Sequence, residues 1–100
     1  MELLKPLSNP DFAAQTAAYT GTAANTTGWS AGPQGVLVWS DQPCYVEVGE
    51  GAVATTASTP IPAYTPVPFA VPLTVTGVWR VSAIAVSSSG TIYTKPINKQ

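Results

Sequence analysis

Proline placement between residues 60 and 76 is the feature that most restricts what this chain can fold into. Every proline of the stretch occupies an even-numbered position: Pro60, Pro62, Pro66, Pro68 and Pro72. The odd positions of its second half are apolar: Val67, Phe69, Val71, Leu73 and Val75. In a β-strand, residues two apart share a face, and their N–H groups share an edge. Because proline lacks an N–H, the pattern predicts an edge strand with one buried face and a bend near Tyr64.

Several other segments have the alternating or β-branched composition that predicts a strand. The expected strands are a weak one over 15–22, then Val36–Trp39, Cys44–Val48, a short one from Val53 to Thr56, Val78–Val86 and Thr91–Ile97. Residues 25–34 are expected to form a loop. We predict that Ser87–Gly90 is a hairpin loop joining the last two strands, with Gly90 at a positive φ. Apolar residues on both faces of Val78–Val86 indicate a central strand or a bulge.

Short strands separated by Gly/Pro turns, without a helical apolar period, predict an all-β fold. We expect a single small antiparallel β-sandwich or a jelly-roll-like barrel, since 100 residues fit one domain. The chain is divided into an extended N-terminal arm (1–12), a β-sandwich domain (13–97) and a C-terminal tail (98–100). The start lacks the pattern of a signal peptide, and the uncharged stretch 51–79 contains too many prolines for a transmembrane helix. We therefore expect a soluble protein made in a cytoplasm.

Charge and composition argue against several classes of function. Charged residues make up 9% of the chain, with four Lys and Arg against five Asp and Glu and no histidine. No basic stripe is present for nucleic acid, and catalysis or metal binding through histidine within one chain is excluded. Asp41, Glu47 and Glu50 fall close together and could serve as glycosidase carboxylates or Ca²⁺ ligands. We expect instead a turn residue and two solvated groups, with no enzyme activity, no metal and no cofactor.

Aromatic and apolar residues outside the strands are the candidate contact sites. Trp39 and Trp79 lie in strand contexts and are expected in the core, whereas Trp29 lies in a Thr/Gly/Ser segment and is a candidate interface anchor. Alternatively, the three tryptophans could form stacking platforms for a sugar together with the tyrosines Tyr19, Tyr45, Tyr64 and Tyr93. Arg80 is interpreted either as a hydrogen-bond donor at a rim or as an intersubunit salt-bridge partner. The candidate protein-interface residues are Leu3, Leu4, Leu7 and Phe12 on the arm, together with Trp29.

Several short motifs follow one another in an order that points to a family. They include Gly35-Val-Leu-Val-Trp39, Pro43-Cys-Tyr-Val-Glu-Val-Gly49, Arg80-Val-Ser-Ala-Ile-Ala-Val86 and Gly90-Thr-Ile-Tyr93. Over roughly residues 15–97 the chain resembles small structural proteins encoded by tailed bacteriophages. The resemblance implies a β-sandwich virion component attached to the head as a decoration or cement protein, and it brings no catalytic residues with it.

A weakly charged Thr/Ala/Pro surface is poorly suited to a free monomer and suits a protein that sits against other protein. Together with the resemblance, this predicts a capsid decoration protein on the outer surface of a virion. It would bind and brace major capsid protein subunits, and we expect a homo-oligomer, most simply a trimer. Two alternatives stay open: a tail or head–tail joining component, and a glycan- or receptor-binding module displayed on the particle.

Overall fold

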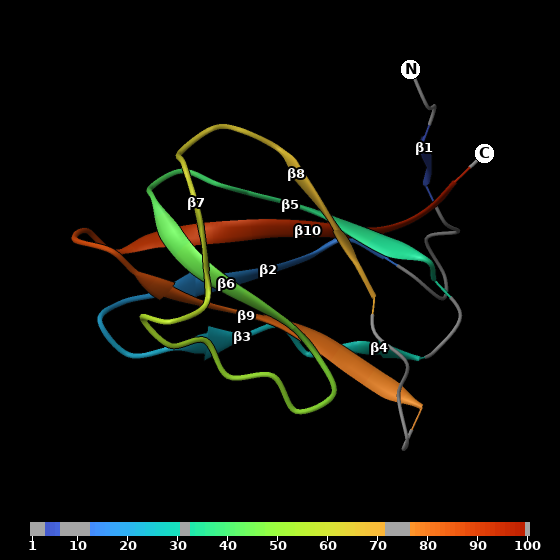
Figure 1. Cartoon of the computed structure of the whole chain (residues 1–100), viewed down its shortest axis with the longest axis horizontal. Helices are drawn as coiled ribbons and strands as arrows, with labels where there is room; N and C mark the ends of the chain where they lie inside the picture. The colour runs from blue at the N-terminus through green and yellow to red at the C-terminus, as the bar shows by residue number, and fades with distance from the viewer. Residues whose placement is uncertain (1–3, 7–12, 31–32, 72–76, 100) are drawn as a thin grey trace.

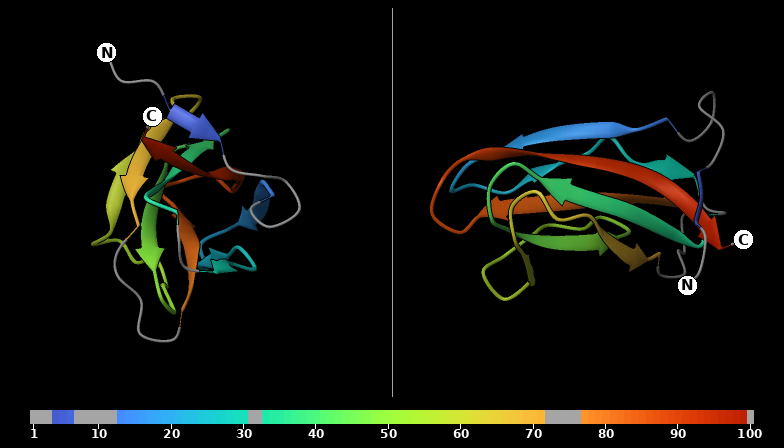
Figure 2. Two further views of the ribbon diagram at one scale, coloured as in Figure 1. Left: turned by 90° about the vertical axis from the view of Figure 1, so that its right-hand side faces the viewer. Right: turned by 90° about the horizontal axis from the view of Figure 1, so that it is seen from above.

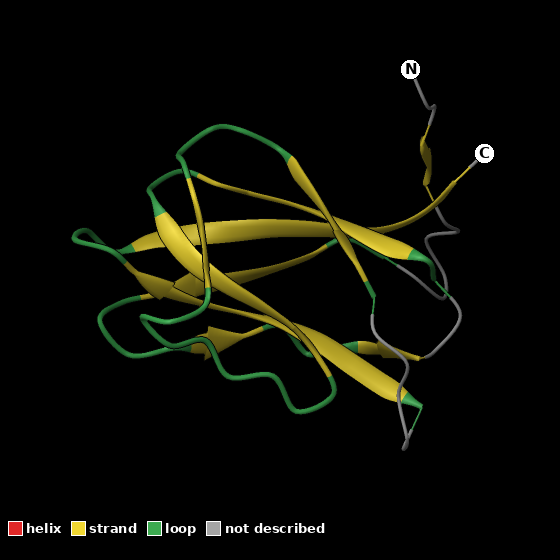
Figure 3. Ribbon diagram, in the orientation of Figure 1, coloured by secondary structure: helices red, strands yellow, loops and turns green. Residues whose placement is uncertain are grey.

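Two antiparallel β-sheets pack against each other in this computed structural model, which describes residues 4–6, 13–30, 33–71 and 77–99 (Figure 1). The first sheet consists of β1 (Leu4–Pro6), β2 (Gln15–Tyr19), β5 (Gly35–Ser40), β8 (Val67–Ala70) and β10 (Gly90–Lys99). The second consists of β3 (Ala24–Asn25), β4 (Trp29–Ser30), β6 (Cys44–Gly49), β7 (Thr59–Ile61) and β9 (Val78–Ala85). Strands and loops account for all described residues (Figure 3). The prediction of an all-β, antiparallel sandwich is therefore confirmed.

One long strand lies at the centre of each sheet. In the first sheet the order is β1-β10-β5-β8, and residues 92–94 of β10 pair with β2 as well as with β5. In the second the order is β3-β9-β6-β7, and Ser82 and Ala83 of β9 pair with both β3 and β6. The prediction that the segment following Gly77 forms a central strand is confirmed. Seen along the long axis, the strands enclose the interior (Figure 2).

The interior is filled by alternate residues of the central strands and by two tryptophans. The rings of Trp29 and Trp79 lie 4.8 Å apart between centroids, and both side chains are buried. Aromatic pairs at such separations add to stability beyond the area they bury. The other members of the buried cluster are Ala17, Tyr19, Val36, Val38, Cys44, Val46, Ile61, Val81, Ala83 and Ile92. The core thus draws on β2, β4, β5, β6, β7, β9 and β10.

The proline-rich segment supplies an edge strand to each sheet. β7 pairs only with β6 and β8 only with β5, so each lies at the end of its sheet. Pro60, Pro62, Pro66 and Pro68 are all exposed, while Ile61 is buried. The predicted edge character, the parity of Val67, Phe69 and Val71, and the bend at Tyr64 are confirmed. Leu73 and Val75 lie outside the described residues. The segment differs from expectation in crossing from one sheet to the other at Tyr64.

Three local predictions are wrong. Residues 53–56 form no strand, and part of the expected loop 25–34 forms β4. The last two strands do not form a hairpin, because β9 and β10 belong to different sheets. Gly90 therefore lies inside β10 rather than at a turn, and its φ is not positive. Its small size is still needed: a Cβ there would lie 2.5 Å from Asp41 Oδ1 and 2.7 Å from the Tyr19 hydroxyl.

The loop after β6 covers the middle of the outer side of β9. Ala52 and Ala54 are buried against the outer side of β9. The Ala54 N–H donates to Ser82 Oγ at 2.8 Å, and Arg80 Nε donates to the Ala52 carbonyl at 2.9 Å. Ser82 is fully buried as a result, and Arg80 acts within the chain as a donor to backbone.

A polar network closes the corner at which the chain passes from β5 to β6. The Tyr19 hydroxyl donates to the Gln42 carbonyl at 2.8 Å and shares a 2.5 Å hydrogen bond with Ser40 Oγ. The Thr91 N–H donates to Asp41 Oδ1 at 2.8 Å, so Asp41 stabilises the turn as predicted. Burial raises the pKa of the Tyr19 hydroxyl to about 12. Burial also raises the pKa of the neighbouring Cys44 thiol, the small buried residue expected.

The backbone of Gly28 is closely packed in the loop before β4. The Gln15 side-chain amide pairs with the Gly28 backbone as a neighbouring strand would. Its Nε2 donates to the Gly28 carbonyl and its Oε1 accepts from the Gly28 N–H, both at 2.9 Å. Gly28 has φ +103°, and a Cβ would lie 2.7 Å from the Trp79 carbonyl oxygen.

We expect Gly28→Ala to lower the free energy of unfolding by roughly 1–3 kcal/mol in urea denaturation. Gly21→Ala, where a Cβ meets nothing within 4 Å, is the matched control and should change it by less than about 0.5 kcal/mol. Equal effects would contradict this account.

The corner network predicts a loss of stability at high pH. Because the pKa of Tyr19 is about 12 in the folded state and 10.0 ordinarily, the unfolded chain releases this proton first. The stability that the neutral hydroxyl contributes is therefore complete below pH 10 and is lost as the pH rises toward 12. We expect urea unfolding to show this decrease in the wild type, and a smaller decrease in Tyr19→Phe. Tyr19→Phe should also cost about 1–3 kcal/mol at neutral pH by leaving buried partners unpaired. An identical pH profile for the two proteins would refute the role of the network.

Candidate functional site

The predicted contact residues lie in different parts of the molecule. Leu4 is in β1, which pairs with the end of β10 in the register Leu4↔Lys99. Leu3, Leu7 and Phe12 lie outside the described residues. Trp29 does not stand in a loop with an exposed ring: it is in β4, is 4% exposed, and donates from Nε1 to the Ala13 carbonyl at 2.9 Å. The structure does not bring Leu4 and Trp29 into one site, and their role in an interface stays a prediction.

Trp39 is on the outside of the first sheet, contrary to its predicted place in the core. The residues of β5 alternate, with Val36, Val38 and Ser40 buried while Leu37 and Trp39 are half-buried on the opposite face. Ser40 is drawn inward by the corner network, and a strand turns successive side chains to opposite faces. The inward place of Ser40 therefore turns Trp39 outward. Trp79, in contrast, is fully buried as predicted.

Three aromatic rings form a row across this outer face, which we name the aromatic row: Tyr93, Trp39 and Tyr64. Tyr93 of β10 is the register partner of Trp39, and the two rings are stacked with centroids 4.4 Å apart and planes 16° apart. The Tyr64 ring lies 6.3 Å from that of Trp39, tilted by 34°. Tyr64 is 69% exposed and marks the bend between β7 and β8. The row thus follows the order β10, β5 and then the connection that leads into β8.

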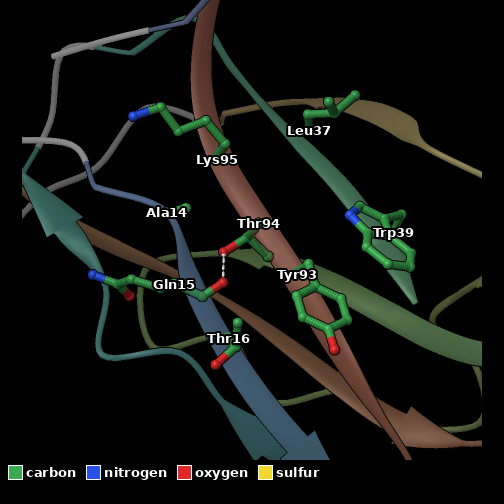
Figure 4. A pocket seen from close by; sticks show the side chains of 8 residues that line it. All are labelled: Ala14, Gln15, Thr16, Leu37, Trp39, Tyr93, Thr94 and Lys95. Carbon is green, nitrogen blue, oxygen red and sulfur yellow. Dashed lines mark hydrogen bonds between the residues drawn. The ribbon is translucent and has the colours of Figure 1, made fainter. Parts of the chain in front are cut away.

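A shallow groove of about 150 Å³ adjoins the aromatic row (Figure 4). It is lined from three neighbouring strands and the residue before β2: Ala14, Gln15, Thr16, Leu37, Trp39, Tyr93, Thr94 and Lys95. Its walls are mostly apolar, and none of these residues is an acid. Two of the polar side chains are committed to the fold, because Thr94 Oγ1 donates to the Gln15 carbonyl at 2.7 Å while the Gln15 amide holds Gly28. The groove therefore has a base fixed by internal hydrogen bonds.

The position of the groove follows from strand parity. On β10, Ile92 and Thr94 are buried, so Tyr93 and Lys95 face outward. The pairing Thr16↔Tyr93↔Trp39 places three outward side chains in one line across the sheet, and Lys95↔Leu37 places the next pair beside it. The groove lies between these two lines of side chains.

The acidic residues near the β5–β6 corner do not form a site. Asp41 is occupied by the Thr91 N–H, and Glu47 is exposed on β6. Among the described residues, no group of three or more Cys, Asp or Glu side chains lies close enough to hold a metal ion. The part of the chain that the structure describes also contains no helix long and apolar enough to cross a membrane.

Comparisons with known proteins add no relative: no protein-family model, no curated protein and no solved structure matches the chain. The assignment of function must therefore rest on the sequence and on the surface just described.

Sequence reasoning named Trp39, Tyr64 and Tyr93 as candidate platforms, but it placed Trp39 in the core and did not bring the three rings together. Within Gly35–Ser40, Val36 and Val38 share the parity of Ser40, while Trp39 shares that of Leu37. Either face of such a strand can be buried on composition alone. The decisive contact is that of Ser40 with Tyr19, which is 21 residues away in the chain.

Tryptophan fluorescence distinguishes this arrangement from the one expected. Trp29 and Trp79 are 4% and 0% exposed, so Trp39 should account for the quenchable part of the emission. We expect acrylamide to quench the wild type partially and Trp39→Phe several-fold less, with a shift of its emission to shorter wavelength. Trp29→Phe is the matched control and should keep the quenchable fraction. If Trp39→Phe retained that fraction, Trp39 would not lie on the outer face.

Proposed function

We propose that the chain is a non-enzymatic structural protein of a bacteriophage virion, namely a capsid decoration or cement protein that braces major capsid subunits. Its motif order resembles that of small tailed-phage structural proteins, and the resemblance implies a β-sandwich. The two antiparallel sheets agree with that implication. On this proposal the protein is assembled on the outer surface of the capsid as a homo-oligomer, and it acts by binding.

The observation that carries the proposal is the weak charge of the surface. Of the charged side chains described in the sandwich, Asp41 and Arg80 already bond to backbone groups, at 2.8 and 2.9 Å. The exposed positions are largely Thr, Ser, Ala and Pro. A free monomer with little charge repulsion has a low barrier to association, whereas one fixed on a particle buries this surface against neighbours. Repetition over a shell then converts modest contacts into firm attachment.

The edges of the sheets favour contact through side chains and the arm. β7 and β8 are edge strands, and the exposed prolines at Pro60 and Pro68 lie within them. Proline at a sheet edge discourages the addition of another strand. A partner is therefore better accommodated through the N-terminal segment, where β1 pairs with the end of β10. This supports the predicted role of Leu4 and of the arm around it.

Deleting residues 1–12 tests the proposed attachment. We incubate the purified chain with phage capsids that lack it and measure occupancy by sedimentation and electron microscopy. The wild type should saturate a defined set of sites on the head, and the deletion should bind at least about tenfold more weakly because the arm supplies apolar contacts.

Two controls make the result interpretable. The deletion removes β1, so it must still unfold cooperatively, and Leu4→Asp provides a milder change in the same strand. Gly21→Ala should bind like the wild type, since a Cβ there meets nothing within 4 Å. Unchanged occupancy of the deletion would refute the arm as clamp, and failure of the wild type to bind any capsid would refute the decoration function. Density on the tail alone would assign the chain to that part of the particle instead.

A further inference from the structure

We propose that the groove beside the aromatic row is a binding site for a neutral oligosaccharide. The inference rests on the outer face of the first sheet and does not depend on the capsid function. It assigns a ligand to Trp39, Tyr93 and Tyr64, none of which belongs to the buried core cluster. Three observations carry it: the shape and lining of the groove, its charge, and the backbone of Tyr64.

The groove has an apolar lining against which one face of a sugar ring can pack. Its volume of about 150 Å³ equals that of a cavity able to hold a six-membered ring such as benzene. Tyr93, Trp39 and Leu37 present apolar surface to the C–H groups of such a ring. The exposed Thr16 hydroxyl and the Tyr93 hydroxyl offer hydrogen-bonding groups to sugar hydroxyls. A mostly apolar lining with a few polar groups is the usual composition of a small-ligand site.

Little of the groove has to be ordered on binding. The backbone beneath it belongs to the paired strands β2, β10 and β5. Thr94 and Gln15 are fixed by hydrogen bonds of 2.7 and 2.9 Å, and the Tyr93 and Trp39 rings support each other by stacking. A preformed site reduces the entropic cost of binding a weakly interacting ligand.

Charge restricts the class of ligand. The lining contains Lys95 and no carboxylate, so nothing in it would pair with a cationic ligand. A nucleotide or a sulfated glycan would bring several negative charges to a single lysine, whereas recognition of such groups normally uses clustered Arg and Lys. A neutral ligand with hydroxyl groups fits the lining best. A protein partner would cover about 800 Å² of surface, which is far more than a groove that holds one ring.

Tyr64 is an independent indication that the aromatic row contacts a ligand. Its φ is +57°, a region that non-glycine residues with large side chains rarely occupy, and its N–H donates to the Ser40 carbonyl at 2.7 Å. Strained backbone of this kind is concentrated at ligand-binding and active sites. The ring is 69% exposed, so core burial does not offset the strain. Because it lies next to Trp39 at the end of the row, it extends the apolar surface of the row by one position beyond the groove.

Direct binding measurements test the proposal on the full-length chain. The probes are neutral hexasaccharides of β-glucose, α-glucose, mannose and N-acetylglucosamine, with AMP and a heparin hexasaccharide as charged comparisons, measured by saturation-transfer NMR and calorimetry. We expect at least one neutral hexasaccharide to bind with a Kd in the range of about 0.1–1 mM. Tyr64→Gly keeps the backbone at positive φ while removing the ring, and it should weaken binding by about 3- to 10-fold, the effect of losing one apolar contact. Trp39→Ala should weaken it by at least about tenfold.

The controls separate this site from the capsid function. Gly21→Ala should leave sugar affinity unchanged, and Tyr64→Gly should leave capsid occupancy unchanged. If no neutral hexasaccharide bound at 10 mM concentration (a level about tenfold above the expected Kd), or if AMP or heparin bound more tightly, the proposal would be overturned. It would equally be overturned if Tyr64→Gly and Trp39→Ala bound the sugar normally. Loss of capsid binding in Tyr64→Gly without any sugar binding would assign the aromatic row to a protein contact.

Discussion

The hydrogen bonds of the Tyr19 hydroxyl at the β5–β6 corner determine which residues of the first sheet face outward. Ser40 is the last residue of β5, and its hydroxyl lies 2.5 Å from that of Tyr19. Since side chains alternate along a strand, a register shift of one residue would exchange both faces of β5 at once. Burying Ser40 therefore buries Val36 and Val38 and leaves Trp39 outside. The same corner joins Asp41, which follows β5, to Thr91 near the start of β10, so two of the three strands that line the groove share one constraint.

The sequence was sufficient to predict the strands of the sheet centres and the character of the edges. β5, β6 and β9 were expected within one residue at most ends, because each combines β-branched residues with a turn cluster. The even parity of the prolines was sufficient to identify β7 and β8 as edge strands. These features are local: a missing N–H or an apolar alternation restricts a strand wherever it lies in the fold. The N-terminal division at residue 12 is not tested by these observations.

The assignment of strands to sheets could not be predicted from the same signals. Ser87–Gly90 has the composition of a hairpin loop, yet β9 and β10 pair with different neighbours. The loop at Ala52 and Ala54 covers Arg80 and Ser82 on the outer side of β9, so Ser82 is buried there without a second sheet above it. Trp29 and Trp39 were misplaced for a related reason, whereas Trp79 is buried as predicted. The Trp29 ring packs in the core against that of Trp79, which is 50 residues away in the chain. A contact between residues so far apart in sequence cannot be predicted from the local pattern.

The two proposals concern different parts of the same strand, and this makes them separable. β1 pairs with β10 from Ile97 onward, along an edge of the sheet. The groove lies on the outer face, and its residue nearest to this pairing is Lys95, two residues before Ile97, which corresponds to about 7 Å along a strand. On the capsid proposal the arm contributes its own apolar side chains, whereas the sugar is held by side chains of the outer face, so neither uses the atoms that the other needs. A rigid central strand can therefore carry an attachment point and a ligand site together, and the loss of one does not by itself remove the other.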